Sequence, residues 1–133
     1  MPNKDYQIPP NNPANEGMAL KNWVDNVFFN LSAKNHQIVT EAVSLNLDSR
    51  FVQLQSSGSG YAVTLAAPTL PGIYKTVQKT SNNADNITMS LTNCFGQPSG
   101  TTVTWNSQND IIVLVSCANS KWYIVSYNGV AFS

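Results

Sequence analysis

The side chains of this 133-residue chain that could do acid–base or metal chemistry are few and scattered. A catalytic histidine needs an orienting carboxylate and a nucleophile, and neither can be assigned to the one histidine, His36. The histidine and the cysteines also lack the spacing of metal ligands. We therefore expect no catalytic residue, no metal site and no cofactor, and we expect the protein not to be an enzyme.

The carboxylates and cysteines have ordinary explanations. Asp85 and Asp110 lie in predicted turns, where aspartate commonly caps the backbone. A glycoside hydrolase would need two carboxylates facing each other across a cleft. Cys94 and Cys117 are the only cysteines, and we expect two reduced, packed thiols, although neighbouring strands could still bring them together as a pair.

Aromatic side chains are the remaining candidates for a binding role. An exposed ring could stack on a sugar or enter a subunit interface. We rank packing in a core first, a subunit interface second and a glycan site third. The candidates in the predicted β-region are Tyr61, Tyr74, Trp105, Tyr123 and Tyr127.

Composition and charge exclude several classes of partner. Only 11% of the residues are charged, and the formal net charge is zero. The cations are scattered, so no basic face for nucleic acid is expected, while zero net charge permits self-association. No apolar run is long enough for a membrane span, and no signal peptide follows Met1. We expect a soluble protein without a membrane partner, made in a cytoplasm.

An extended arm is predicted over residues 1–15. Its four prolines and its asparagines exclude a helix or a central strand. So few apolar side chains cannot order the segment alone, and we expect it to order only against a partner; the alternative is a disordered tail. Tyr6 and Ile8, followed by Pro9 and Pro10, form a short extended unit that could dock in a groove or along a sheet edge of a partner.

One amphipathic helix is predicted over residues 16–36. Large apolar side chains recur there at steps of three and four residues and share one face. Trp23 and Phe28 belong to this stripe and must be buried. Whether the stripe packs on its own domain, on sister helices or on a docking partner is left open.

Residues 43–133 change to alternation with a period of two. Eight or nine short strands separated by turns predict a small antiparallel β-sandwich or barrel, so the chain as a whole is mainly β. Ile111–Val115 is apolar on both sides, as expected for a central strand that is covered twice. Which side of the 73–80 strand faces inward is left open. Asn128-Gly129 predicts a hairpin turn.

Five short phrases follow one another from Val43 onward, at residues 61–68, 71–77, 86–91, 109–115 and 121–133. In this order they resemble a β-module of tail-fibre, head-fibre and capsid-decoration proteins of tailed phages and related large DNA viruses. The likeness covers about two-thirds of the chain and rests on the order of short phrases. It implies a structural role, usually in a homotrimer, and carries no catalytic residue.

Together these observations lead us to expect a virion structural protein. It would be a trimeric capsid-decoration, cement or head-spike protein, located in the virion. Its arm and helix would bind the major capsid protein or another virion protein. The alternative is a receptor- or glycan-binding module at a tail-fibre tip.

Overall fold

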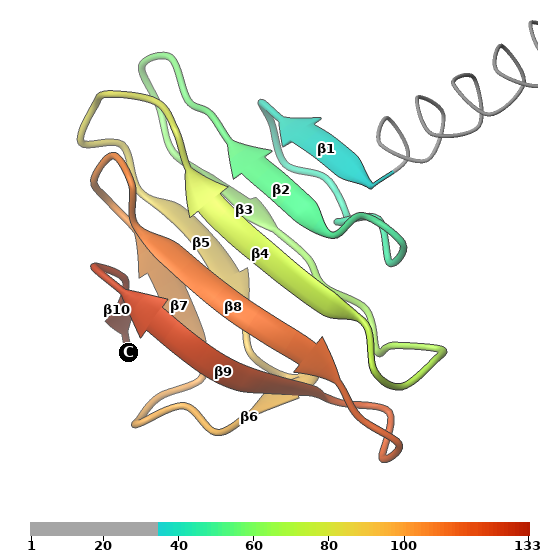
Figure 1. Cartoon of the computed structure of the whole chain (residues 1–133). Coiled ribbons are helices and arrows are strands. Elements are labelled where there is room, and N and C mark those ends of the chain that lie inside the picture. Colours follow the sequence, from blue (N-terminus) through green and yellow to red (C-terminus); the bar gives the residue numbers. More distant parts are fainter. Residues whose placement is uncertain (1–34) are drawn as a thin grey trace, which may run out of the picture. The chain divides into compact units, whose positions relative to one another are not determined.

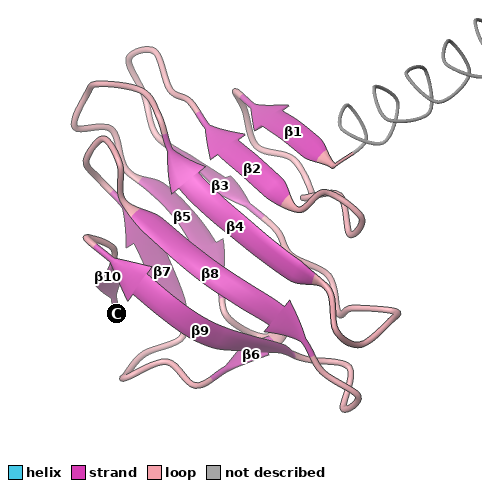
Figure 2. Cartoon of the chain, viewed as in Figure 1, coloured by secondary structure: helices cyan, strands magenta, loops and turns pink. Residues whose placement is uncertain are grey.

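The computed structural model describes residues 35–133, which form a β-domain (Figure 1). These residues fold into ten strands joined by turns and loops, without a helix (Figure 2). In chain order the strands are β1 (His36–Val39), β2 (Phe51–Leu54), β3 (Tyr61–Val63), β4 (Tyr74–Lys79), β5 (Ile87–Ser90), β6 (Cys94–Phe95), β7 (Thr102–Trp105), β8 (Ile111–Ser116), β9 (Trp122–Asn128) and β10 (Ala131–Phe132).

The strands form two sheets that face each other. The six-stranded sheet has the order β1-β2-β4-β8-β9-β6, and the four-stranded sheet has the order β10-β7-β5-β3. In Figure 1 the larger sheet lies in front of the smaller one. From β2 to β8 the chain changes sheet at every connection, so each sheet is assembled from strands that are not consecutive.

The prediction of a mainly β, sandwich-like domain is confirmed, but the prediction of antiparallel pairing throughout is wrong. Four of the eight strand pairs are parallel, namely β1–β2, β2–β4, β3–β5 and β6–β9. Along the chain, β2 is followed by β3 in the opposite sheet and then by β4 beside β2. The chain therefore returns to the first sheet in its original direction. Alternation along a strand is the same in both kinds of pair and cannot reveal this.

Some strand boundaries also differ from those expected. β1 begins at His36, ahead of the expected β-region and on a residue assigned to the end of the helix. The alternating segment 43–47 forms only an isolated bridge between Ser44 and Thr64, although Leu45 is buried. β9 and β10 belong to different sheets, so the Asn128-Gly129 turn is a corner between sheets and the predicted hairpin is wrong.

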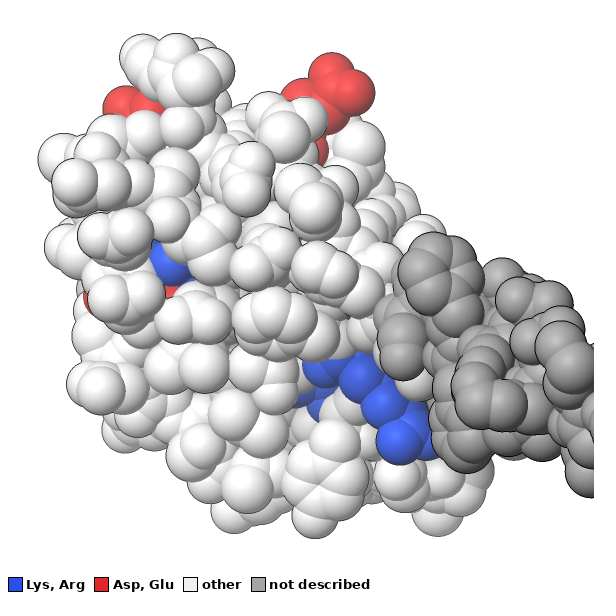
Figure 3. Space-filling model, turned by 45° about the horizontal axis from the view of Figure 1, so that its top comes forward, with Lys and Arg blue, Asp and Glu red and all other residues white. Residues whose placement is uncertain are grey.

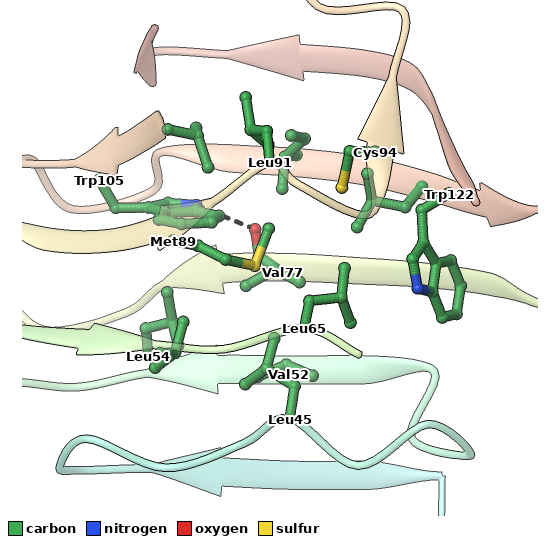
Figure 4. Packing of buried hydrophobic residues seen from close by; sticks show 14 of the residues in the cluster. Leu45, Val52, Leu54, Leu65, Val77, Met89, Leu91, Cys94, Trp105 and Trp122 are labelled. Atoms are coloured by element: carbon green, nitrogen blue, oxygen red, sulfur yellow. Dashed lines mark hydrogen bonds between the residues drawn. The ribbon is translucent and has the colours of Figure 1, made fainter. Parts of the chain in front are cut away.

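The core lies between the two sheets and is apolar (Figure 4). Alternate residues of each strand point into it, as the period of two requires. Trp105 and Trp122 are its largest side chains, and both are fully buried. Each indole keeps a hydrogen-bond acceptor, because Trp105 Nε1 donates to the Val77 carbonyl at 3.2 Å and Trp122 Nε1 donates to the Ala66 carbonyl at 2.9 Å.

The inward side of β4 is the side that carries two lysines. Lys75 and Lys79 are fully buried on either side of Val77, which settles the question left open by the sequence. The Lys75 ammonium donates to the carbonyls of Asn46, at 2.6 Å, and of Ser49. The Lys79 ammonium donates to two carbonyls of the β4–β5 connection. Each lysine therefore ties one end of the strand to a loop.

Candidate functional site

The outward side of the six-stranded sheet carries rows of side chains that the strand register places next to one another. Paired positions in neighbouring strands lie on the same side of a sheet. The first row runs through Tyr74, Val115, Tyr123 and Phe95, on β4, β8, β9 and β6. The Phe95 and Tyr123 rings are in contact, with centroids 5.1 Å apart.

Two further rows complete this surface. The second row is His36, Phe51, Thr76, Val113 and Ser126, and the third row is Ile38, Gln53, Gln78, Ile111 and Asn128. We call the residues of the three rows the outer uncharged face. It extends across all six strands, because each row crosses from strand to strand along the register.

None of the residues of the outer uncharged face is an acid, a lysine or an arginine. The only charged residues in the six strands are Lys75 and Lys79, and both point into the core. Figure 3, an oblique view, is largely white, with charged side chains in a few separate spots. Arg50 immediately precedes β2 and is a charge at the border of the face.

Several large apolar side chains of this face are open to solvent. Ile38, Tyr74 and Tyr123 are 58%, 57% and 41% exposed. On β8, Ile112 and Leu114 are fully buried on the inward side, while Val113 and Val115 are only partly covered on the outward side. Within residues 35–133 only the inward side of this strand is covered, although its sequence has the composition of a strand whose two sides are both buried. The face therefore has the character of a contact surface.

The outward side of the four-stranded sheet differs in chemistry. One row across it is Ala62, Thr88, Thr104 and Ala131. The neighbouring pair is Ser90 and Thr102, so hydroxyl and methyl groups form this surface. Such small, partly polar side chains are suited to contact with water. The apolar character is therefore particular to one side of the domain.

A β-bulge decides which aromatic residues of β9 reach the outer uncharged face. Val113 pairs with Ser126, whereas Leu114 pairs with Ile124, so Val125 is the extra residue. Beyond the bulge Tyr127 pairs with Ile112, whose side chain points inward. The side chain of Tyr127 therefore does not belong to the outer uncharged face.

Of the five candidate aromatics, Tyr74 and Tyr123 are brought together in one row. Tyr127 instead contacts Phe132 of β10 edge-on, at a centroid distance of 4.9 Å. The hydroxyl of Tyr61, on β3, lies 2.6 Å from the Gln55 carbonyl oxygen and 3.0 Å from the Val39 carbonyl oxygen, so its single proton is shared between two acceptors. Trp105 lies in the core, so its ring is not available to a ligand at the surface.

Sequence reasoning does not select Ile38, Phe51 or Phe95 as contact residues, yet the register places all three on the outer uncharged face. The signal that points to this surface is the double apolar pattern of 111–115. It predicts a second covered side for the central strand, and the neighbours of that strand follow once the register is known.

The titratable groups of the described residues are dispersed. The His36 ring is hydrogen-bonded to Gln53 at 2.8 Å and stacks on Phe51. Cys94 and Cys117 are not joined, and burial raises the pKa of the Cys94 thiol to about 11, with a smaller opposing effect from Lys121. In residues 35–133 no three histidine, cysteine or acidic side chains are grouped to hold a metal ion.

The predicted docking residues of the arm and helix lie outside the described residues. They are Tyr6, Ile8, Pro9, Pro10, Trp23 and Phe28. The predicted arm and almost all of the predicted helix lie there too. Among the described residues, no helix is long and apolar enough to cross a membrane.

Comparison of the chain with protein-family models and with curated proteins finds no match in either set.

Proposed function

We propose that this protein is a non-enzymatic structural subunit of a virus particle, a capsid-decoration, cement or head-spike protein. The observation that carries the assembly role is the outer uncharged face, where Ile38, Tyr74 and Tyr123 are exposed beside partly covered valines. The resemblance of residues 43–133 to phage and large-virus β-modules supplies the viral setting and the expected homotrimer.

The energetic argument favours a bound state for this face. Each square ångström of apolar surface removed from water contributes about 25 cal/mol, so covering a few exposed aromatic and aliphatic side chains contributes several kcal/mol. A surface without fixed charges loses little on desolvation, because no ammonium or carboxylate has to leave water. Such a face matches a role in permanent assembly better than a role in transient, charge-steered encounter.

The test of the particle role is quantitative mass spectrometry of purified virions from a host in which the gene is expressed. We expect the protein in many copies per particle, in fixed ratio to the major capsid protein, and still bound after washing in high salt. High salt should not remove it, because the predicted docking residues of the arm and helix, such as Tyr6, Trp23 and Phe28, carry no charge. Its absence from purified particles would contradict the proposal.

A second function, a receptor- or glycan-binding tip, is supported by the row that contains Tyr74 and Tyr123. Neighbouring exposed rings on a sheet can stack against the apolar side of a sugar. A glycan array with the full-length protein tests this directly. We expect no saturable signal if the face is an assembly surface, whereas a signal that Tyr74→Ala abolishes would favour the glycan-binding function.

A further inference from the structure

The polar groups of the outer uncharged face have a chemical property in common. They are the amides of Gln53, Gln78 and Asn128, hydroxyl groups and one imidazole. Each of these groups can both donate and accept a hydrogen bond. A carboxylate can only accept and an ammonium can only donate, and neither occurs on this face. A surface of this kind is complementary to a copy of itself.

We propose that the outer uncharged face binds the same face of a second copy of this chain. The inference rests on the proposed assembly role and names the partner of its contact surface. A two-fold contact joins two chains, so it is separate from the contacts that would join three chains in the expected homotrimer. When two identical faces meet about a two-fold axis, a charged side chain near the axis faces its own copy and repels it. The three rows of this face contain no charged side chain that could do so. The repulsion that normally opposes self-pairing of a surface is therefore absent.

The composition of the face agrees with sheet-on-sheet contact. Tyr74, Val113, Val115 and Tyr123 are residue types that fill the inner faces of β-sandwiches, where two sheets pack about 10 Å apart. The middle strand β8 would then be covered on both sides, as its apolar sequence predicts. The amides of the third row would lie toward the border, where amide–amide hydrogen bonds between copies cost no buried charge.

A nucleic acid or an acidic protein partner would call for cations on the face, which has none. The outward side of the four-stranded sheet offers the contrast within the molecule. Its alanine, serine and threonine side chains offer little apolar area to a partner, so the same inference does not extend to it.

The test uses the full-length protein in sedimentation equilibrium at micromolar concentration. Two double variants place like charges on the face, Tyr74→Lys with Tyr123→Lys, and Tyr74→Glu with Tyr123→Glu. We expect native self-association and, in each variant alone, association weakened on the order of 100-fold. A one-to-one mixture of the two variants should restore a complex, since lysines on one copy then face glutamates on the other.

The matched control is Ala62→Lys with Ser90→Lys, which adds the same charge to exposed positions on the other sheet. We expect its association to stay within about threefold of the native value. Thermal melting checks that each variant is folded. If a double variant fails to fold, Ile38→Lys with Asn128→Lys, in the third row, replaces it.

Four results would overturn the inference. They are a native protein that is monomeric, face variants that associate as the native protein does, a control that dissociates equally, and a mixture that stays monomeric. One further pattern would show that another part of the same chain covers this face. In that pattern the native protein is a monomer, and the double variants are monomers that melt at much lower temperatures. A monomer that is nevertheless abundant in purified virions would leave the particle role intact and overturn only the self-pairing.

Discussion

Lys75 shows how one buried charge is accommodated in a small β-domain. Burial lowers the pKa of its ammonium to about 8, and the nearby Asp48 carboxylate acts in the opposite direction. Two loop carbonyls accept hydrogen bonds from the ammonium, and its Nζ lies 5.6 Å from the centroid of the Trp122 ring. The lysine thus fixes the loop around Asn46 and Ser49 against the core, at the cost of a desolvated ammonium.

This arrangement predicts a pH dependence of stability. The folded pKa of Lys75, about 8, lies below the value of about 10.4 expected in the unfolded chain. Between these two values the unfolded chain binds more protons, so the contribution of Lys75 to stability rises as the pH increases. Urea unfolding at pH 7, 8, 9 and 10 should show the native protein gaining stability relative to Lys75→Met across this window.

The comparison isolates Lys75 because the shifted Cys94 thiol acts in both proteins. The pKa of Cys94 is raised to about 11, so its contribution to stability falls as the pH rises from about 8.5 to 11. The control is Glu41→Gln, at an exposed residue that contributes to neither pKa shift, and it should run parallel to the native protein. Parallel curves for Lys75→Met as well would show that the buried amine does not titrate in this range.

At the scale of elements, the corner between β9 and β10 packs against Asp110, whose carboxylate is fixed by the turn between β7 and β8. Its Oδ2 accepts the backbone amides of Asn106 and Ser107, at 2.9 and 2.8 Å. Gly129 passes so close that a Cβ there would lie 2.2 Å from Asp110 Oδ1, and its φ is +83°. The corner is therefore packed against a carboxylate that immediately precedes β8 and is distant in sequence.

Gly129→Ala should destabilise the fold more than a matched glycine substitution. Gly72 has the same φ of +83°, but a Cβ at that position would meet no atom within 4 Å, so Gly72→Ala measures the backbone cost alone, about 1 kcal/mol. Gly129→Ala should cost about 2 kcal/mol more, because the methyl group displaces the carboxylate from its hydrogen bonds. Equal midpoints of urea denaturation for the two variants would contradict this account.

At the scale of the whole molecule, β1 is the strand whose membership of the domain the sequence does not predict. It forms the edge of the six-stranded sheet and pairs in parallel with β2. Val39 is buried, and its carbonyl accepts the Tyr61 hydroxyl. The domain therefore begins at β1 rather than at Val43.

Two truncations test this boundary. The fragment 35–133 should unfold cooperatively, because it contains both sheets and the core. Removing 35–40 as well deletes the buried Val39 side chain and a strand pair, at a cost of at least about 2 kcal/mol. That corresponds to a fall in Tm of roughly 8–16 °C. Identical melting curves for the two fragments would show that β1 adds nothing to the domain.

The candidate surface is only partly predictable from the sequence. Tyr74 and Tyr123 stand out as aromatic residues of strands, and the register does bring them together. Tyr127 stands out on the same grounds, but the bulge at Val125 turns it away. A bulge is one extra residue accommodated by the partner strand, so it leaves no mark on the composition of β9 itself.

The sequence by itself determined the period-two segments and turns, and with them a mainly β domain in which residues such as Ile87 and Met89 share a side. Those properties are local, since they depend only on neighbouring side chains and on the pleat. Strand direction, sheet membership and the inward side of β4 were decided by the tertiary structure. Lys75 can point inward only because a loop distant in sequence brings carbonyl oxygens to its ammonium group. Lys79 can do so because the connection that follows β4 brings carbonyl oxygens to its own ammonium group.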